Sequence, residues 1–152
     1  MTTPNALVIA QTYVRAVESK NRDGVAATLA DTVRHIFPIS YGPVEHPQAV
    51  FEGKDEVLAY IDSLFNKFSS MRWPAPDWTV SADGSRAFLE GKGDGVVAHS
   101  RSPYRNTYMI RFDLENGLIV RVTEYANSEY YVAQNIPPVE VEIRAAERAA
   151  AL

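Results

Sequence analysis

Glu124 is the clearest candidate for chemistry in this sequence, because it stands on a strand face that is otherwise apolar. The pattern of residues 118–126 alternates, and Glu124 shares its face with Leu118, Val120, Val122 and Ala126. A carboxylate in such surroundings either pairs with another group or becomes difficult to ionise. A carboxyl group of this kind can give or take a proton near neutral pH, so we predict that Glu124 is a general acid or base.

The preceding strand places two polar residues opposite this carboxylate. Asn106 and Tyr108 alternate with Arg105 and Thr107, and they should face the same interior as Glu124. Both side chains could orient or polarise a substrate carbonyl. Two plainer alternatives are that Tyr108 only packs, and that Glu124 forms an ion pair with Arg105.

His35 is the second candidate for proton transfer. It shares a strand face with Val33 and Phe37, and an imidazole can shuttle protons near pH 7. The alternative is a hydrogen-bonded core histidine without a catalytic role. His46 and His99 lie in polar segments and are expected to be solvated, and the three histidines lack the spacing of zinc ligands.

Aromatic and aliphatic residues could complete a pocket for a cyclic, largely apolar ligand. The candidates are Phe37, Trp73, Trp78, Phe88 and Val122. We expect at least two of the aromatic residues to be core under the helices instead. Glu90 lies on the same strand face as Phe88. It is either a second pocket acid or, as we favour, a solvated charge.

The elements that must position these residues begin with a long hairpin over residues 104–127. Asn116-Gly117 is a strong signal for a two-residue type I′ turn, because both residues tolerate a positive φ. Thr3 and Pro4 look like the cap and first position of a helix, and Asp23 like the cap of a short one ending near Ala30. A third helix should follow Gly53.

The remaining segments read as strands and irregular chain. We predict strands over 33–39 and 87–97, the latter loosened by glycines, and an irregular loop over 40–53. Helices followed by an antiparallel meander indicate an α+β fold, with a twisted sheet curled around a long helix to enclose a cone-shaped cavity. We assign residues 1–136 to one domain and 137–152 to a tail, possibly helical, that is mobile or contacts a second copy.

Composition narrows the functional class. The chain has 152 residues, a net charge of -4 and no cysteine, which excludes disulfides and thiolate chemistry and argues against nucleic acid or anionic membrane as a partner. We see neither a signal peptide nor a membrane span in the sequence, so we expect a cytoplasmic protein.

The sequence resembles the ketosteroid-isomerase-like, or nuclear-transport-factor-2-like, cone fold in its SnoaL-like branch. Matching pieces are Phe37-Pro38-Ile39 and Phe51-x-Gly53-Lys54. The run from Tyr104 through Asn116-Gly117 to Arg121-x-x-Glu124-Tyr125-x-Asn127 is similar to phenazine-biosynthesis A/B-type proteins. The resemblance implies an acid/base role for Glu124 in the pocket with a histidine beside it, a place that His35 could fill. The paired aspartates of ketosteroid isomerases and the Asp-Arg-Asp set of limonene-epoxide-hydrolase-like enzymes find no match.

The absence of metal-ligand and nucleotide-binding motifs from the sequence favours an enzyme without cofactor or metal. The resemblance implies that its substrate is a cyclic ketone or polyketide-like molecule on which it moves protons. Isomerisation, cyclisation, dehydration and condensation all fit. A homodimer through the outer face of the sheet is also implied. The fold hosts non-catalytic proteins too, so a small-molecule binding module and a protein-interaction adaptor remain alternatives.

Overall fold

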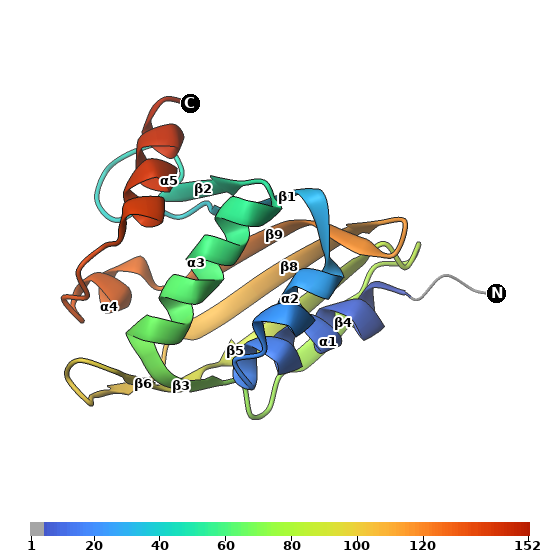
Figure 1. Cartoon of the computed structure of the whole chain (residues 1–152), viewed down its shortest axis with the longest axis horizontal. Coiled ribbons are helices and arrows are strands. Elements are labelled where there is room, and N and C mark those ends of the chain that lie inside the picture. Colours follow the sequence, from blue (N-terminus) through green and yellow to red (C-terminus); the bar gives the residue numbers. More distant parts are fainter. Residues whose placement is uncertain (1–4) are drawn as a thin grey trace.

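A computed structural model describes residues 5–152 (Figure 1). Its elements in chain order are α1 (Ala6–Glu18), α2 (Arg22–Thr28), β1 (Leu29–Phe37), β2 (Ala49–Glu52), α3 (Lys54–Lys67), β3 (Phe68–Arg72), β4 (Asp77–Val80), β5 (Arg86–Lys92), β6 (Asp94–Val97), β7 (Pro103–Tyr104), β8 (Thr107–Glu115), β9 (Leu118–Ala126), α4 (Ser128–Val132) and α5 (Glu140–Ala150). The main sheet has the strand order β2-β1-β9-β8-β5-β4, and a smaller sheet has the order β3-β6-β7. Only the β1–β9 pair is parallel among the strands described. The expected α+β class is confirmed.

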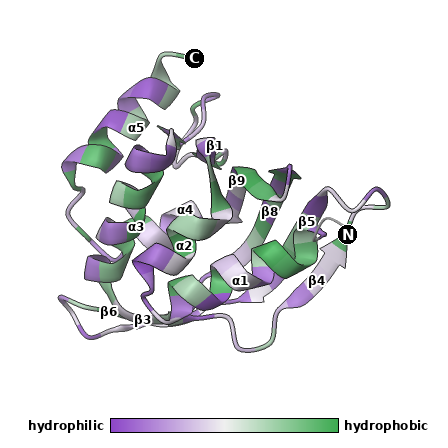
Figure 2. Cartoon of the chain, turned by 45° about the vertical axis from the view of Figure 1, so that its right-hand side comes forward, coloured by the Kyte–Doolittle hydropathy of each residue, from purple (hydrophilic) through white to green (hydrophobic). Residues whose placement is uncertain are grey.

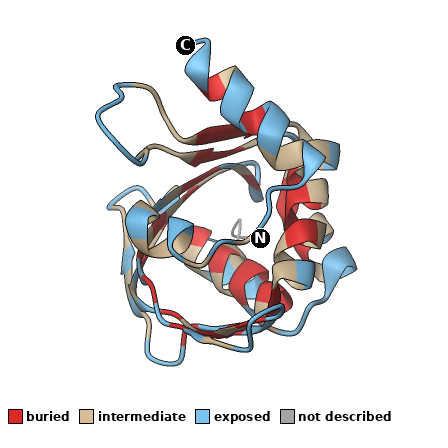
Figure 3. Ribbon diagram, turned by 90° about the vertical axis from the view of Figure 1, so that its left-hand side faces the viewer, coloured by how far each residue is buried: buried red, intermediate tan, exposed pale blue. Residues whose placement is uncertain are grey.

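The main sheet curves around α1, and α3 lies across its open side (Figure 3). The largest fully buried side chains come mostly from the strands and from α3; they include Phe51, Ile61, Leu89, Phe112 and Ile119. Their burial removes apolar surface from water at about 25 cal/mol per Å² and holds helices and sheet together. The interior therefore lies between the concave face of the sheet and the helices.

The N-terminal helices are capped by asparagines. The side-chain oxygen of Asn5 accepts the Val8 N–H at 3.2 Å, and that of Asn21 accepts the Gly24 N–H at 2.9 Å. The predicted cap at Thr3 and Pro4 lies outside the described residues. The predicted cap at Asp23 is wrong by two positions, because Asp23 already lies in the first turn of α2.

The β8–β9 hairpin has the predicted turn, with φ of 51° at Asn116 and 75° at Gly117. The predicted alternation of β9 is wrong at its start. A bulge near Val120 lets two residues of β9 oppose one of β8, so Ile119 is buried and Leu118 is exposed. Beyond the bulge the residues that face inward are the predicted ones, and Glu124 is among them.

Two predicted segments are divided differently in the structure. The segment 40–53 contains strand β2, which pairs with β1 and is fully buried at Phe51. The predicted strand 87–97 is two strands in different sheets, β5 and β6, interrupted at Gly93. A Cβ at Gly93 would lie 2.7 Å from Cε2 of Tyr108, so only glycine allows the Tyr108 ring to pack there.

The C-terminal segment 137–152 contains a helix, α5, whose hydrophilic residues alternate with hydrophobic ones along its length (Figure 2). It packs against β2, where Arg148 donates to the Val50 carbonyl at 2.7 Å and forms an ion pair with Glu56. Ala149 packs there against Ile36 and Val50. In residues 5–152 no helix has the length and apolar character needed to cross a membrane.

Candidate functional site

The two residues predicted to move protons lie together. Strands β1 and β9 are parallel neighbours with His35 opposite Val122, so the His35 side chain reaches the Glu124 carboxylate two residues further on. Nε2 of His35 and Oε2 of Glu124 are 2.9 Å apart. The His35 side chain is 3% exposed and that of Glu124 is 13% exposed. This is a buried hydrogen-bonded pair with one end open to a cavity. Arg105, the alternative partner, lies on the surface instead, 3.7 Å from Asp94.

Aromatic rings hold the His35 imidazole in place. It stacks on Phe37 with 4.9 Å between ring centroids and meets Tyr60 edge-on at 5.0 Å. Because Nε2 is committed to Glu124, the second ring nitrogen is the one left to interact with other groups. Within residues 5–152 that Nδ1 atom is buried and has no hydrogen-bond partner. Glu124 and the aromatic rings therefore hold the imidazole in place, while its Nδ1 atom keeps an unused hydrogen-bonding site.

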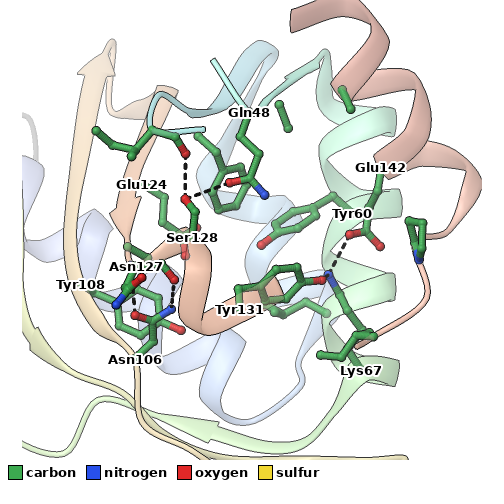
Figure 4. Close-up of a pocket in the computed structure, with 18 of the residues that line it drawn as sticks. Gln48, Tyr60, Lys67, Asn106, Tyr108, Glu124, Asn127, Ser128, Tyr131 and Glu142 are labelled. Atoms are coloured by element: carbon green, nitrogen blue, oxygen red, sulfur yellow. Dashed lines mark hydrogen bonds and ion pairs between the residues drawn. The ribbon is translucent and has the colours of Figure 1, made fainter. Parts of the chain in front are cut away.

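A cavity of about 220 Å³ opens beside the pair. Glu124, Tyr108, Asn106 and Phe37 line it, as predicted from the sequence. In Figure 4, Glu124 and Tyr108 lie on the strand side of this cavity, while Tyr60 and Glu142 approach from the helices. Most of its exposed lining is apolar, which suits a ligand with few polar groups.

A second, inner cavity of about 30 Å³ lies behind the first. His35, Trp73 and Val122 line it, and Tyr108 and Glu124 line both spaces. Its volume suffices for one or two water molecules or a small polar group of a ligand. The Trp73 Nε1–H is buried and has no hydrogen-bond partner in the described part of the chain. The inner cavity is thus bordered by a free donor on Trp73 and by a histidine with a free nitrogen.

Asn106 lines the cavity, but its side chain has no capacity left for a substrate. Its Nδ2 group donates to the Tyr104 hydroxyl at 2.8 Å and to the Asn127 carbonyl at 3.1 Å. Its Oδ1 accepts the N–H groups of Thr107 at 2.8 Å and Asn127 at 3.0 Å. A carboxamide has two donors and two acceptor sites, so all four are used. The expected substrate contact is replaced by a structural role, namely tying β8 to the end of β9.

Two predicted pocket residues lie elsewhere. Phe88 pairs across the sheet with Arg111 and faces outward, so its assignment to the pocket is wrong. The parity of β5 places Leu89 inward instead, and Glu90, on the outer face with Phe88, is exposed as favoured. Trp78 packs against Phe112 with centroids 6.2 Å apart and lines neither cavity, so it belongs to the core. The expected homodimer through the outer face stays a prediction.

The sequence reasoning missed much of the lining, including the side that the helices supply. Tyr60 and Lys67 come from α3, Tyr131 from α4 and Glu142 from α5. A signal existed for Tyr60, which follows Val57 by three residues on the buried stripe of α3. Nothing in the local sequence marks Glu142, because its place depends on how α5 packs on the domain.

The tyrosines around Glu124 are held in their neutral form. Burial raises the pKa of Tyr13, Tyr60, Tyr104, Tyr108 and Tyr131 above the ordinary tyrosine value. In the first four of these the negative charge of Glu124 adds to the rise in pKa. Their hydroxyl groups are therefore hydrogen-bond donors at neutral pH, and Tyr60 and Tyr108 present theirs at the cavity.

The raised tyrosine pKa values predict a steep loss of stability in alkali. Below pH 10 both the folded and the unfolded chain keep these tyrosines protonated. Above it the unfolded chain ionises first, so each tyrosine should lower the free energy of unfolding by roughly 1.4 kcal/mol per pH unit until its folded pKa is reached. Urea unfolding between pH 8 and 11, with tyrosinate absorbance, measures this. Tyr108→Phe should make the decline shallower, and a decline as steep as that of the wild type would contradict the prediction.

Within residues 5–152 no three histidine, aspartate or glutamate side chains are grouped as metal ligands would be. The polar groups at the cavity are instead the Glu124 carboxylate with its His35 partner, several hydroxyls, and the ion pair of Lys67 and Glu142. The fold and this site define an α+β cone of the NTF2-like type with a buried carboxylate–imidazole pair.

The comparisons with known proteins agree with this class. The SnoaL-like domain family matches residues 10–122, and the chain belongs to that family. The uncharacterised protein YesE of Bacillus subtilis strain 168 is 30% identical over 92 residues, which are 60% of this chain and 62% of that protein. This match therefore spans less than two thirds of the relative's length.

Solved structures share the fold. A candidate polyketide cyclase from Xanthomonas campestris pv. campestris superimposes with a TM-score of 0.70 at 23% identity, over 85% of this chain and 95% of that one. A phenazine biosynthesis-related protein from Pseudomonas aeruginosa gives a TM-score of 0.65 at 18% identity, over 89% and 92%. The resemblance predicted from the last two strands is confirmed for family and fold.

Proposed function

We propose that the protein is an acid/base enzyme acting on a compact, largely apolar cyclic ketone. The observation that carries the proposal is the Glu124–His35 hydrogen bond of 2.9 Å at the wall of an apolar cavity. A carboxylate held in this way can reach a carbon-bound hydrogen of a ligand while shielded from bulk water. The family relationship supports the choice of reaction class, and the substrate class rests on the lining of the cavity.

The proposed reaction begins with proton abstraction. Glu124 takes a proton from the carbon next to the carbonyl, and the electrons of that C–H bond form the C=C bond of an enolate. The negative charge then lies on the former carbonyl oxygen. Where the substrate has a C=C bond beside that carbon, the enolate is a dienolate, and the neutral Glu124 carboxyl returns the proton to the far carbon of the dienolate, which shifts the C=C bond and completes an isomerisation. Alternatively, the enolate carbon attacks a second carbonyl of the same molecule; the π electrons of that C=O bond move to its oxygen, which takes the proton from Glu124, and a ring is closed. Only protons and bonding electrons of the substrate move, so this reaction needs no cofactor.

The neighbours of Glu124 have separate parts in this scheme. His35 orients the carboxylate through Nε2 and leaves its other oxygen to face the substrate. The Tyr60 and Tyr108 hydroxyls line the same cavity and can donate hydrogen bonds to the developing enolate oxygen. Burial raises their pKa, which keeps these donors protonated throughout the reaction. The aromatic walls supplied by Phe37 and Phe51 favour a cyclic substrate.

The alternative is a binding module of the same fold. Such a protein would use the same site without turnover, and it would have Glu124 locked in a salt bridge or the cavity filled by side chains. The open volume beside Glu124 and the single hydrogen bond from His35 to one carboxylate oxygen favour the enzyme. An enzyme would exchange the hydrogens next to the ligand's carbonyl with solvent, whereas a binding module would bind the ligand without such exchange.

Hydrogen exchange in D2O tests the proposal directly. Bicyclic ketones such as 1-tetralone are incubated with the protein, and loss of the signal from the hydrogens next to the carbonyl is followed by proton NMR. We expect exchange faster than in buffer and in protein heated to unfolding. Saturable binding without enhanced exchange would instead identify a binding module.

A further inference from the structure

A second polar cluster lies across the cavity from Glu124, and the proposed reaction does not use it. It consists of Lys67 at the end of α3, Tyr131 in α4 and Glu142 in α5 (Figure 4). The Lys67 ammonium donates to the Tyr131 hydroxyl at 3.1 Å and to Oε2 of Glu142 at 3.0 Å. The Lys67 side chain is 8% exposed and that of Glu142 is 16% exposed. Three separate helices thus bring a buried ion pair to the cavity wall.

The Lys67 ammonium has one N–H donor that no described residue accepts. Lysine has three N–H donors, and the described residues accept two of them. Glu142 likewise keeps acceptor capacity, because its Oε2 receives Lys67 and its Oε1 receives only a long hydrogen bond of 3.4 Å from the Val139 N–H. A ligand group that both accepts and donates would find both partners at this one place.

The cluster is connected to the reaction centre through one ring. The Tyr60 ring lies 5.0 Å from the His35 ring between centroids, and the Lys67 ammonium lies 5.5 Å from its centroid. The His35 ring and the Lys67 ammonium are therefore at most 10.5 Å apart, the sum of these two distances. A fused two-ring system with an oxygen at each end fits within this limit.

The charges of the cavity determine what kind of oxygen fits. Its charged lining residues are one lysine and two glutamates, Lys67, Glu124 and Glu142. A carboxylate or phosphate on the ligand would have to compete with Glu142 for Lys67 and would lie near a second negative charge. A cationic ligand would meet a position already filled, because the Lys67 ammonium itself lies over the Tyr60 and Tyr131 rings at 5.5 and 5.2 Å.

The geometry points to an uncharged substrate that carries a hydroxyl at the end remote from its reacting carbonyl, bound between Lys67 and Glu142. The hydroxyl oxygen accepts the third N–H of Lys67, and its hydrogen is donated to Glu142. This inference rests on the proposed function for the placement of the carbonyl at Glu124. It adds the anchor that sets the orientation of the ring system and selects against acidic analogues.

Binding of three matched ketones tests the inference. The probes are 1-tetralone, 6-hydroxy-1-tetralone and the corresponding 6-carboxylate, measured by isothermal titration calorimetry at neutral pH. We expect the hydroxyl compound to bind about tenfold more tightly than 1-tetralone, as one or two new hydrogen bonds would give, and the carboxylate to bind more weakly than both. Equal affinity for the first two, tightest binding of the carboxylate, or no binding of any would overturn the inference.

Variants test whether Lys67 and Glu142 cause the preference for the hydroxyl compound. Lys67→Met together with Glu142→Gln keeps the chain lengths and leaves no unpaired charge, so it should fold. We expect the ratio of the affinities for 6-hydroxy-1-tetralone and 1-tetralone to fall to within twofold. Lys92→Met, on an exposed position of β5, is the matched control and should keep the full preference. A retained preference in the double variant would contradict the inference.

The outcome is separable from that of the proposed function. A hydroxyl preference without hydrogen exchange would leave the anchor in place and reject the enzyme. Exchange without a hydroxyl preference would retain the enzyme and reject only the anchor.

Discussion

Glu124→Gln should lower the rate of ketone hydrogen exchange by about a thousandfold while leaving the fold unchanged. An amide of the same shape cannot take a proton from carbon, and general acid/base groups contribute roughly 10²–10⁴-fold to rates. The glutamine oxygen can still accept the Nε2–H of His35, so the buried histidine keeps its partner. Exchange rates by proton NMR, ligand affinity by calorimetry and thermal melting together measure the effect.

The matched control for this variant is Glu90→Gln. Glu90 is exposed on the outer face of β5, two strands from Glu124, and should keep wild-type exchange rates. A Glu124→Gln protein that still exchanges hydrogen at the normal rate would remove Glu124 from the mechanism. A variant that melts far below the wild type would show that Glu124 is needed for folding rather than chemistry.

The central part of this site could be predicted because Tyr108 and Glu124 each follow the apolar alternation of their own strand, which places both on the inner face. The register counted from the Asn116-Gly117 turn alone would turn Glu124 outward, and the bulge near Val120 brings it back to the inner face. The β1 strand follows the same rule, which places His35 and Phe37 on the inner side. What alternation cannot give is the parallel contact between β1 and β9, since that depends on chain topology; here the family resemblance supplied the expectation that a histidine stands beside the glutamate.

The failures have equally local causes. Phe88 was assigned by residue type, although its parity with the exposed Glu90 predicts an outward side chain. The bulge near Val120 changes which residues of β9 face inward, and no turn residue in the sequence marks its position. Strand β2 was hidden in a segment rich in proline and glycine, where the short run at Val50 and Phe51 gives too little periodicity to recognise.

The helical wall of the cavity was beyond sequence reasoning for a different reason. Lys67 and Glu142 read as ordinary solvated charges on their helices, because a helix pattern does not say which neighbour will cover a charged residue. Their burial follows from α5 packing on β2 and α3, a contact between segments far apart in the chain. The groups proposed to orient the substrate therefore depend on tertiary packing, whereas the groups proposed to transfer protons could be predicted from the strand pattern.

Asn106→Leu should be the most destabilising single change at the site, costing about 3 kcal/mol of unfolding free energy. Leucine fills a similar volume but leaves the Thr107 and Asn127 N–H groups, the Asn127 carbonyl and the Tyr104 hydroxyl without the side chain that now satisfies them. Buried polar groups left in this state cost about 1–3 kcal/mol each, and part of that is recovered where water can reach. For a chain of this length the melting temperature should fall by roughly 6–12 °C.

This loss of stability distinguishes a structural Asn106 from a substrate-binding one. Asn127 caps α4 through its side-chain oxygen, which accepts the Tyr130 N–H at 3.2 Å, so Asn106 indirectly holds the helix that carries Tyr131. Asn66→Leu, at an exposed position of α3, is the matched control and should melt within about 2 °C of wild type, since surface changes are usually worth less than 0.5 kcal/mol. If Asn106→Leu instead kept full stability and lost only ligand affinity, the side chain would contact substrate after all, and its four hydrogen bonds would have to rearrange on binding.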